Sequence, residues 1–308
     1  MNQIKIKSPA TIANLSCGFD VLGLCLENPY DEIEVKKQSS KIVTLNILDS
    51  PFSDIPSNPN DNTGGVPAQL ILKDMDLDFG FEINIKKGIP LCGGLGSSAA
   101  TSSGVVFAIN KLLNDSLSLN QMLSYALKGE RVSATNPHAD NIAPCLIGGL
   151  CLIRDTSTLD VIRIPVSDYT LVLIHPDIKI STEDARNILP KNIELSKAIK
   201  QWGNLGALIM GFSKNDSKLI KNSMHDNIIE PIRSKLIEGF DNLKEKSMDF
   251  GALGFGISGS GPTMFALCES KDIAEKICFY ANEFYNSLNL GCDTYLSKIN
   301  HKGPLIIK

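Results

Sequence analysis

The chain has 308 residues, of which 43% are hydrophobic, 21% charged and 6% aromatic. This length and composition indicate a globular protein of about two domains and exclude the disordered, collagenous and membrane classes. Lys and Arg total 30 against 34 Asp and Glu, so the chain lacks a basic field that would hold a polyphosphate backbone, and no nucleic-acid partner is expected.

Eight cysteines occur at uneven intervals in apolar stretches and include no CxxC pair. This pattern predicts buried thiols in a reducing compartment rather than disulfides or a zinc site. Residues 1–8 lack the long apolar core of a signal peptide, and the longest apolar run, 143–153, is shorter than the roughly 20 residues of a membrane helix. We therefore expect a cytoplasmic protein that has no transmembrane segment.

The first 50 positions carry apolar residues mostly at every second position, which predicts that strands open the fold. A loop rich in Pro, Asn, Asp and Ser follows over 50–62. The next expected elements are a helix over 66–75, a strand over 79–86, a glycine-rich loop over 88–96, a helix over 97–113 and a helix over 118–132 with Ser118 as N-cap.

A polar stretch over 155–160 marks the expected division into an N-terminal lobe, 1–155, and a C-terminal lobe, 156–308. The elements expected in the second lobe are a strand over 169–174, helices over 182–189, 193–210 and 228–240, strands over 255–258 and 263–268, a helix over 272–288 and a strand over 292–297. This mixture predicts the α+β class.

The segment Pro90-Leu-Cys-Gly-Gly-Leu-Gly-Ser-Ser-Ala-Ala100 leads directly into a predicted helix. Glycines free the backbone N–H groups, and a helix start concentrates unsatisfied donors and a positive dipole end, which suits phosphate. The alternative is a turn with a serine N-cap. A Walker loop is excluded because no Lys-Ser or Lys-Thr follows the last glycine. The match Gly94-x-Gly96-x-x-Ala99 to the dinucleotide fingerprint is weak, because further residues separate these glycines from the preceding strand.

A second segment, residues 130–144, gathers Glu130, His138, Asp140 and Asn141. A carboxylate at a helix end that faces a phosphate loop is a natural Mg²⁺ ligand, because nucleotide-bound Mg²⁺ prefers one or two carboxylates plus phosphate oxygens. The alternative interpretation is a polar loop whose Asp and Asn cap the next element.

Two further segments are rich in small and polar residues. Ser8–Asp20 lies between expected strands and would by itself be an ordinary turn. Gly254–Thr263 is interpreted as a tight strand connection in preference to a second anion-binding nest.

Taken together and in this order, the four segments resemble the motifs of the GHMP kinase superfamily. The run Pro9-Ala-Thr-Ile-Ala-Asn14-Leu through Gly18-Phe-Asp20-Val-Leu-Gly23 is similar to that of the homoserine kinase family. The Gly-Glu-His openings of mevalonate kinases and galactokinases are absent from the sequence. The resemblance implies a two-lobed α+β fold with ATP between the lobes. Its N-terminal lobe would be like domain 2 of ribosomal protein S5, and its C-terminal lobe ferredoxin-like.

The resemblance implies ATP and Mg²⁺ as cofactors, with Ser98 and Glu130 as metal ligands. The implied nucleotide-binding residues are Asn62, Thr63, Pro90, Gly93, Gly94, Leu95, Gly96, Ser97, Ser98, Ala99 and Ala100. Two departures occur: Cys92 and Gly93 replace the more usual small or Arg residues, and 135–140 is a variant of a motif that more often has Gly before the His. Neither departure removes a chemical group that the mechanism needs.

The resemblance also implies L-homoserine as the substrate, converted to O-phospho-L-homoserine for threonine biosynthesis. Its ammonium matches Asp20, and the motif places Asn14 near its hydroxyl. Its carboxylate matches Arg186 and Arg233, because the guanidinium fork suits carboxylates, and His138 would assist there. The alternative for both arginines is a solvated helix face.

The catalytic residues that the resemblance implies are Asn14, Glu130 and Asn141. Asn141 stands where mevalonate kinases place a catalytic Asp, and an amide cannot accept a proton as a carboxylate can. We expect in-line transfer of the γ-phosphoryl group, driven mostly by positioning, without a dedicated general base. A homodimer is the family expectation. The alternatives are a related kinase of another small alcohol, a regulatory homologue that binds nucleotide without turnover, and an NAD-binding oxidoreductase.

Overall fold

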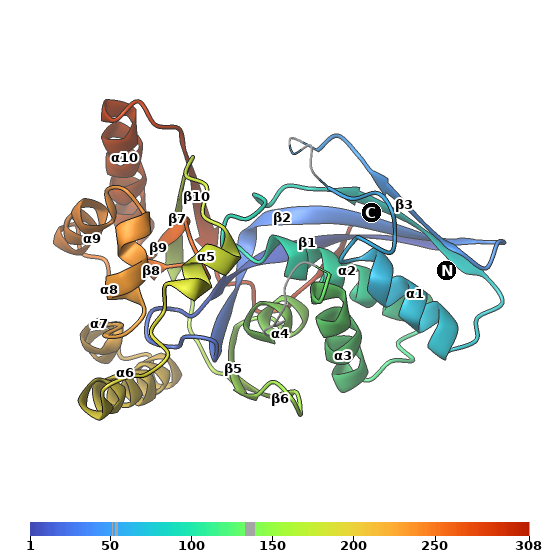
Figure 1. Ribbon diagram of the computed structural model, residues 1–308, viewed down its shortest axis with the longest axis horizontal. Helices are drawn as coiled ribbons and strands as arrows, with labels where there is room; N and C mark the ends of the chain where they lie inside the picture. The colour runs from blue at the N-terminus through green and yellow to red at the C-terminus, as the bar shows by residue number, and fades with distance from the viewer. Residues whose placement is uncertain (51, 53–54, 133–138, 308) are drawn as a thin grey trace.

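The computed structural model describes residues 1–50, 52, 55–132 and 139–307. Among these residues the strands form a seven-stranded sheet and a four-stranded sheet, each with helices packed on it (Figure 1). The strands are β1 (Gln3–Ala13), β2 (Leu22–Gln38), β3 (Val43–Ile47), β4 (Gly80–Lys86), β5 (Leu150–Asp155), β6 (Asp160–Ile164), β7 (Thr170–Pro176), β8 (Gly254–Ile257), β9 (Met264–Cys268), β10 (Cys292–Lys298) and β11 (Leu305–Ile307). The helices are α1 (Gly65–Asp74), α2 (Ser97–Leu112), α3 (Leu119–Glu130), α4 (Ala139–Ile147), α5 (Thr182–Asn187), α6 (Leu195–Lys214), α7 (Ser217–Ser223), α8 (Glu230–Arg233), α9 (Phe240–Asp249) and α10 (Lys271–Ser287), with a 3₁₀ turn η1 (Ser234–Leu236).

The first sheet has the strand order β11-β1-β2-β4-β3, and β5 and β6 extend it beside β2. Its strands pair antiparallel except β3 with β4. In β2, Ile33 and Val35 are buried, whereas Glu34 between them is partly exposed, as the two-residue period of a strand requires. The register places Ile33 opposite both Ile6 and Ile85, which forms an apolar row across three strands.

Helices α1 to α4 cover one face of the first sheet (Figure 1). The helix α2 packs against both β1 and β2. A Cβ atom at Gly104 of α2 would lie only 2.6 Å from Ile33 Cδ1, so glycine allows the helix to approach the sheet closely. This close packing fixes the N-terminus of α2, where the predicted phosphate loop ends.

The second sheet has the order β10-β7-β9-β8 with antiparallel pairs throughout. Counted in chain order within this sheet, its strands lie fourth, first, third, second, and helices connect the first to the second and the third to the fourth. This is the ferredoxin-like β-α-β-β-α-β arrangement. The predicted α+β class and the ferredoxin-like second lobe are therefore confirmed.

A buried apolar cluster joins the two sheets. It includes Ile12 and Leu24 from the first sheet, Leu173 and Phe265 from the second, and Phe212 from α6. The predicted division at residue 155 falls at the last residue of β5. β6 pairs with β5, and β11 at the end of the chain pairs with β1, so the first sheet is built from residues on both sides of that position.

The structure corrects several expected elements. The predicted helix over 228–240 is instead the short α8, the turn η1 and a separate α9, because Gly239 adopts a left-handed φ of +82° and begins a new helix. The apolar run over 143–153 is divided between α4 and β5 by Gly148 and Gly149, both with positive φ. The elements that were not predicted are α4, β5, β6, α7 and β11. Within the described residues, no helix combines the length and apolar character needed to cross a membrane.

Candidate active site

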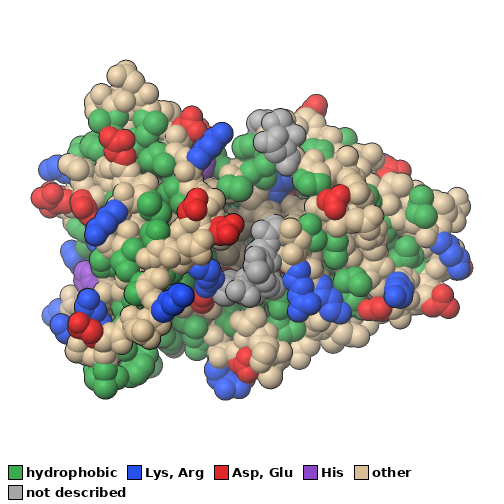
Figure 2. All heavy atoms as spheres, in the orientation of Figure 1, with side chains coloured by type: hydrophobic (Ala, Val, Ile, Leu, Met, Phe, Trp, Pro, Cys, Tyr) green, Lys and Arg blue, Asp and Glu red, His purple; other side chains and the backbone are tan. Residues whose placement is uncertain are grey.

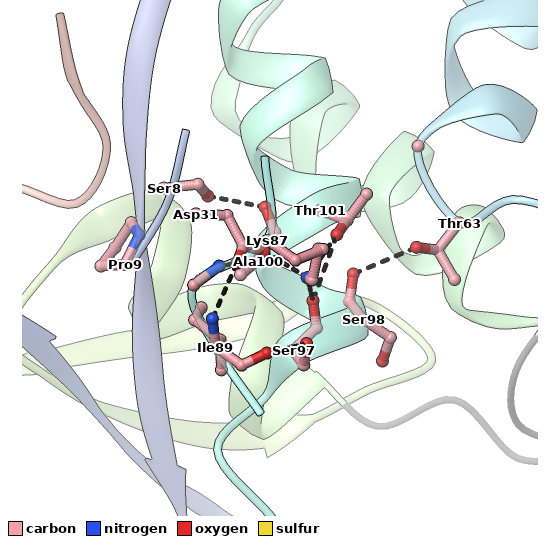
Figure 3. Close-up of polar contacts among 12 residues, drawn as sticks. Ser8, Pro9, Asp31, Thr63, Lys87, Ile89, Ser97, Ser98, Ala100 and Thr101 are labelled. Carbon is pink, nitrogen blue, oxygen red and sulfur yellow. Dashed lines mark hydrogen bonds and ion pairs between the residues drawn. The ribbon is translucent and has the colours of Figure 1, made fainter. Parts of the chain in front are cut away.

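The phosphate loop is tied to the first sheet by a buried ion pair. Lys87 directly follows β4, and its ammonium pairs with the carboxylate of Asp31 on β2, with both side chains almost fully buried (Figure 3). Lys87 Nζ also donates to the Ser97 carbonyl oxygen at 2.8 Å and to Thr101 Oγ1 at 2.9 Å. Asp31 Oδ1 accepts two backbone N–H groups from the beginning of the loop. One ion pair therefore holds both ends of the loop.

Two glycines of the loop have backbone conformations that other residues rarely adopt. Gly94 and Gly96 have φ of +79° and +65°. A Cβ at Gly94 would lie 2.2 Å from the Ser258 carbonyl oxygen, and one at Gly96 would lie 2.2 Å from Thr11 Oγ1. Gly96 is the N-cap of α2 and brings no side chain to cap its first N–H groups. The positive end of the helix is therefore open to an anion.

Ser98 and Glu130 meet beside the loop, as the sequence predicted. Ser98 lies in the first turn of α2, and Glu130 is the last residue of α3. Ser98 Oγ donates a hydrogen bond to Glu130 Oε2, with 2.9 Å between the two atoms. Burial raises the pKa of the Glu130 carboxyl from 4.5 to about 7, although the Ser98 hydrogen bond and the charge of Lys87 act in the opposite direction. A cation at this position would hold the carboxylate in its ionised form.

Asn62 and Thr63 lie just before α1, and Thr63 contacts Ser98. Thr63 Oγ1 donates to the Ser98 carbonyl oxygen at 3.4 Å (Figure 3). Asn62 is buried, and its amide supports its own loop: Oδ1 accepts the Gly64 N–H at 2.8 Å and Nδ2 donates to the Pro56 carbonyl oxygen at 2.8 Å. Thr63 thus borders the loop, while Asn62 shapes the backbone beside it.

The segment between β1 and β2 forms a compact polar turn. Asn14 and Asp20 both have positive φ, of +72° and +59°, a region that Asn and Asp occupy more readily than most residues. Asn14 Oδ1 accepts the Asp20 N–H at 3.1 Å, and Asn14 Nδ2 donates to the Gly259 carbonyl oxygen at 2.8 Å. The Asn14 side chain therefore connects this turn to the β8–β9 connection of the second lobe.

Two arginines from the second lobe reach this turn. Arg186 of α5 forms an ion pair with Asp20. Arg233 of α8 is buried, and its guanidinium donates to the carbonyl oxygens of Ala185 and Gly259, both at 2.9 Å. Both guanidinium groups lie over the ring of Phe19, at 5.6 Å and 5.1 Å from its centroid. The Asp20 carboxylate and the two guanidinium groups thus lie close together in space around the Phe19 ring.

A buried acid, Asp140, and a partly exposed amide, Asn141, line the same region from the start of α4. Asn141 Oδ1 accepts a hydrogen bond from Thr11 Oγ1 at 2.7 Å. Burial raises the pKa of the neighbouring Asp140 carboxyl to about 7, and the charge of Asp20 acts in the same direction. Asp140 Oδ1 has no hydrogen-bond partner within the described part of the chain.

The phosphate loop and the polar turn meet at the junction of the lobes. Ser258 Oγ donates to the Gly94 carbonyl oxygen at 2.6 Å, and the Thr11 N–H donates to the Leu95 carbonyl oxygen at 3.1 Å. The molecular surface is hollowed at this junction, with charged side chains beside the hollow (Figure 2). The geometry therefore places an anion-binding helix start next to a pair of opposite charges.

Family models and related proteins agree with this geometry. The model of the GHMP kinases N terminal domain matches residues 67–149, and that of the GHMP kinases C terminal region matches residues 195–287. A homoserine kinase of Chlorobium phaeobacteroides is 36% identical over 320 residues, with 100% of both chains covered. One from Methanococcus maripaludis is 37% identical and covers 95% of this chain and 98% of its own. The chain belongs to the homoserine kinase family of the GHMP kinases.

Solved structures place the fold in the same group. The crystal structure of homoserine kinase from Cytophaga hutchinsonii is 43% identical, covers 100% of this chain and 98% of its own, and superposes with a TM-score of 0.95. The mevalonate kinase of Methanococcus jannaschii is 16% identical with a TM-score of 0.74, and this likeness shows a shared fold alone. Kinase chemistry with ATP follows from membership of the family.

Most of the predicted site residues come together at the lobe junction. The phosphate loop 90–100, Thr63, Ser98 and Glu130 form one group, and Asn14, Asp20, Arg186 and Arg233 form the other. Their individual roles stay predictions. His138 lies outside the described residues.

Sequence reasoning missed four groups that shape the site: Asp31, Lys87, the Thr11 hydroxyl and the Gly259 carbonyl oxygen. A lysine at the end of a strand and an acid in a charged strand are ordinary surface patterns, so no local signal marks the first two. The Gly254–Thr263 segment is the tight strand connection that was expected, and its Gly259 carbonyl accepts from both Asn14 and Arg233.

Proposed function

We propose that this protein transfers the γ-phosphoryl group of Mg·ATP to the side-chain hydroxyl of L-homoserine, which yields O-phospho-L-homoserine for threonine biosynthesis. ATP would bind with its phosphates at the loop 90–100 and with its adenosine near Asn62 and Thr63. Homoserine would bind at the turn that contains Asn14 and Asp20. The two reactants would then approach each other across the lobe junction.

The observation that carries the proposal is the charge arrangement beside the phosphate loop. A free amino acid presents an ammonium and a carboxylate, and the site offers Asp20 for the first and Arg186 and Arg233 for the second. In the structure Asp20 and Arg186 are paired with each other, and Arg233 donates to backbone carbonyl oxygens beside them. Homoserine would replace this internal pair by two new ones, which supplies selectivity for a zwitterion.

The residues present fit a magnesium ion that enters with the nucleotide. Ser98 Oγ and Glu130 Oε2 lie 2.9 Å apart at the start of the anion-binding helix, and a hydroxyl and one carboxylate leave the remaining positions to phosphate oxygens and water. Mg²⁺ bound there would offset the negative charge of the phosphates. Burial raises the pKa of Glu130 to about 7, and a bound cation would stabilise the ionised carboxylate.

The chain's own groups would act chiefly by position and by fixed dipoles. The first N–H groups of α2 stabilise the transferring phosphoryl group, and the Lys87–Asp31 pair holds the loop that supplies them. Asn14, anchored to the Gly259 carbonyl oxygen, orients the acceptor hydroxyl. Asn141 bonds to Thr11 and cannot serve as a carboxylate base, so the hydroxyl proton would pass to the phosphate itself late in a loose transition state.

A substrate panel tests this function. ADP release would be followed by a coupled assay with L-homoserine, mevalonate, galactose or no acceptor, each with and without Mg²⁺. We expect turnover that requires both Mg²⁺ and L-homoserine. Equal or greater turnover with mevalonate, or none with homoserine, would contradict the proposal and favour a kinase of another small alcohol. Location in the cytoplasm and assembly as a homodimer are further parts of the proposal.

A further inference from the structure

A polar side chain lies on the buried face of α6, the helix at the lower left of Figure 1. The other residues that α6 buries are Leu208, Gly211 and Phe212, and Gln201 is only 8% exposed. A buried amide is costly unless its donors and its acceptor are paired, and an apolar side chain would avoid that cost. The partners of Gln201 therefore indicate what this position contributes.

The carboxamide of Gln201 makes three hydrogen bonds to two different segments of the chain. Nε2 donates to the Cys17 carbonyl oxygen at 3.1 Å and to Asp226 Oδ1 at 2.9 Å. Oε1 accepts the N–H of Asn227 at 2.9 Å. Cys17 belongs to the turn between β1 and β2, whereas Asp226 and Asn227 belong to the loop between α7 and α8. One side chain therefore connects two segments that are far apart in the sequence.

The first segment, the β1–β2 turn, carries one half of the proposed homoserine site, because it contains Asn14 and Asp20. Between these two residues Leu15 and Ser16 also have positive φ, of +42° and +67°, which is unfavourable for residues other than glycine. A backbone of this kind keeps its shape only where surrounding contacts hold it. The bond from α6 to the Cys17 carbonyl oxygen is one of these contacts.

The second segment carries the other half of the site. The carboxylate of Asp226 accepts three backbone N–H groups from residues 228–230, at distances of 2.9 to 3.0 Å. These bonds fix the direction in which the short helix α8 begins, and Arg233 is the last residue of α8. Because Gln201 donates to the same carboxylate, it acts on the position of Arg233 through Asp226.

We propose that Gln201 is a positioning residue that sets the distance between the two charged partners of homoserine. Asp20 in the β1–β2 turn receives the ammonium, and Arg233 receives the carboxylate. These two groups of an α-amino acid are attached to the same carbon atom, so their partners must be held at one separation. Gln201 fixes that separation through Cys17 and Asp226. The inference rests on the proposed function, because it takes these segments as the homoserine site.

Steady-state kinetics of Gln201→Met test this role. Methionine has a similar length but lacks the two donors of the amide. The ammonium and the carboxylate take no part in phosphoryl transfer, so their partners bind the substrate and the transition state alike. KM for homoserine should therefore rise about tenfold or more, while kcat and KM for ATP change by less than about threefold. An unchanged KM for homoserine, or an equal rise in both KM values, would overturn the proposal.

Asn204→Ala is the matched control. Asn204 lies one turn further along α6, and its Nδ2 donates to the His225 carbonyl oxygen at 2.7 Å, in the same loop as Asp226. Within the described part of the chain it has no hydrogen bond to the β1–β2 turn. Both variants should lower the melting temperature by a few degrees, but Asn204→Ala should leave KM for homoserine within about twofold. A rise as large as that of Gln201→Met would overturn the role of the bridge.

Hydrogen exchange in the protein without ligands tests the bridge without reference to the substrate. In the β1–β2 turn, the N–H groups of Gly18 and Asp20 bond to Asn14. Gln201→Met should speed exchange both in this turn and at residues 228–230, whereas Asn204→Ala should leave the turn unchanged. Unchanged exchange of the turn in Gln201→Met would overturn the proposal. Faster exchange in both segments together with no wild-type turnover of homoserine would support the bridge and contradict the proposed function.

Gln201→Glu is a second variant that keeps the proposal testable should methionine prevent folding. Glutamate keeps an acceptor for the Asn227 N–H, but it loses both donations and places a second carboxylate beside Asp226. It should show the same pattern of exchange and a rise in KM for homoserine at least as large as that of Gln201→Met. Wild-type KM and wild-type exchange in this variant would overturn the proposal.

Discussion

Glu130→Gln should stabilise the protein without nucleotide and metal, although it removes a group that the proposed reaction needs. The carboxyl of Glu130 is buried at the end of α3, and burial raises its pKa from 4.5 to about 7. Above pH 7 the folded protein must therefore hold a poorly solvated carboxylate. Glutamine has nearly the same shape and stays neutral at every pH.

The magnitude follows from linkage between protonation and folding. Between pH 4.5 and 7 the folded protein binds more protons at Glu130 than the unfolded chain does, so the free energy of unfolding falls as the pH rises. A rise of the pKa from 4.5 to about 7, at about 1.4 kcal/mol per pH unit, amounts to about 3 kcal/mol. The variant should thus exceed the wild type by about 3 kcal/mol at pH 8 and by less than about 1 kcal/mol at pH 5.

Urea unfolding in EDTA at pH 5, 6, 7 and 8 would measure this difference. Asp140, whose pKa burial also raises to about 7, adds its own pH dependence to both proteins and cancels in the comparison. The hydrogen bond from Ser98 can persist with the amide oxygen of glutamine. A difference that is independent of pH, or a variant less stable than the wild type at pH 8, would refute the account of a buried carboxyl awaiting a cation. In activity assays the same variant should lose on the order of 10²-fold or more in kcat, because a metal ligand is removed.

Three further substitutions test other parts of the site. Arg233→Lys keeps the charge but removes the two-pronged guanidinium group. The transition-state stabilisation measured by kcat/KM for homoserine should therefore fall by roughly 2 to 4 kcal/mol, while ATP affinity measured by titration should stay within about twofold. An equal loss of both would place Arg233 on the nucleotide side. Lys87→Met leaves the buried carboxylate of Asp31 without its ion-pair partner and should lower the free energy of unfolding by about 3 to 5 kcal/mol. Thermal melting of the double variant with Asp31→Asn should show partial recovery of stability. A Lys87→Met variant as stable as wild type would contradict the role of the pair. Gly96→Ala forces a Cβ to 2.2 Å from Thr11 Oγ1 at a φ of +65° and should weaken ATP binding at least tenfold or so; unchanged calorimetric affinity would show that the loop tolerates the shift.

The sequence contained enough local information to predict most of the fold. Alternation in β1, β2 and β4 and the capping residue Ser118 were confirmed, the latter with a full capping box to Gln121. The predicted element boundaries were wrong where a glycine with positive φ interrupts an apolar run, as at Gly148 and Gly239. The hydrophobic pattern continues across such a glycine, so it does not show that the backbone changes direction there. The helix α4 was missed because it contains Pro144 and begins among polar residues.

Only the site residues that belong to recognisable sequence motifs could be predicted. Ser98 and Glu130 come from separate helices, yet the family resemblance implied that both bind one metal ion, and they lie in hydrogen-bond contact. The buried pair of Asp31 and Lys87 belongs to no motif, and only the strand register brings the two side chains together. Arg186 was expected on the substrate side, but its ion pair with Asp20 could not be deduced from sequence.

The measurement that tests the central claim most directly is ³¹P NMR of a reaction of the purified protein with Mg·ATP and L-homoserine. The account predicts one new phosphomonoester signal that grows in step with ADP and that carries coupling to the side-chain methylene of homoserine. The Asp20→Asn and Arg233→Lys variants should form the same product more slowly. ADP accompanied only by inorganic phosphate, or a phosphomonoester that forms at equal rate from mevalonate, would contradict the claim that this site binds and phosphorylates homoserine.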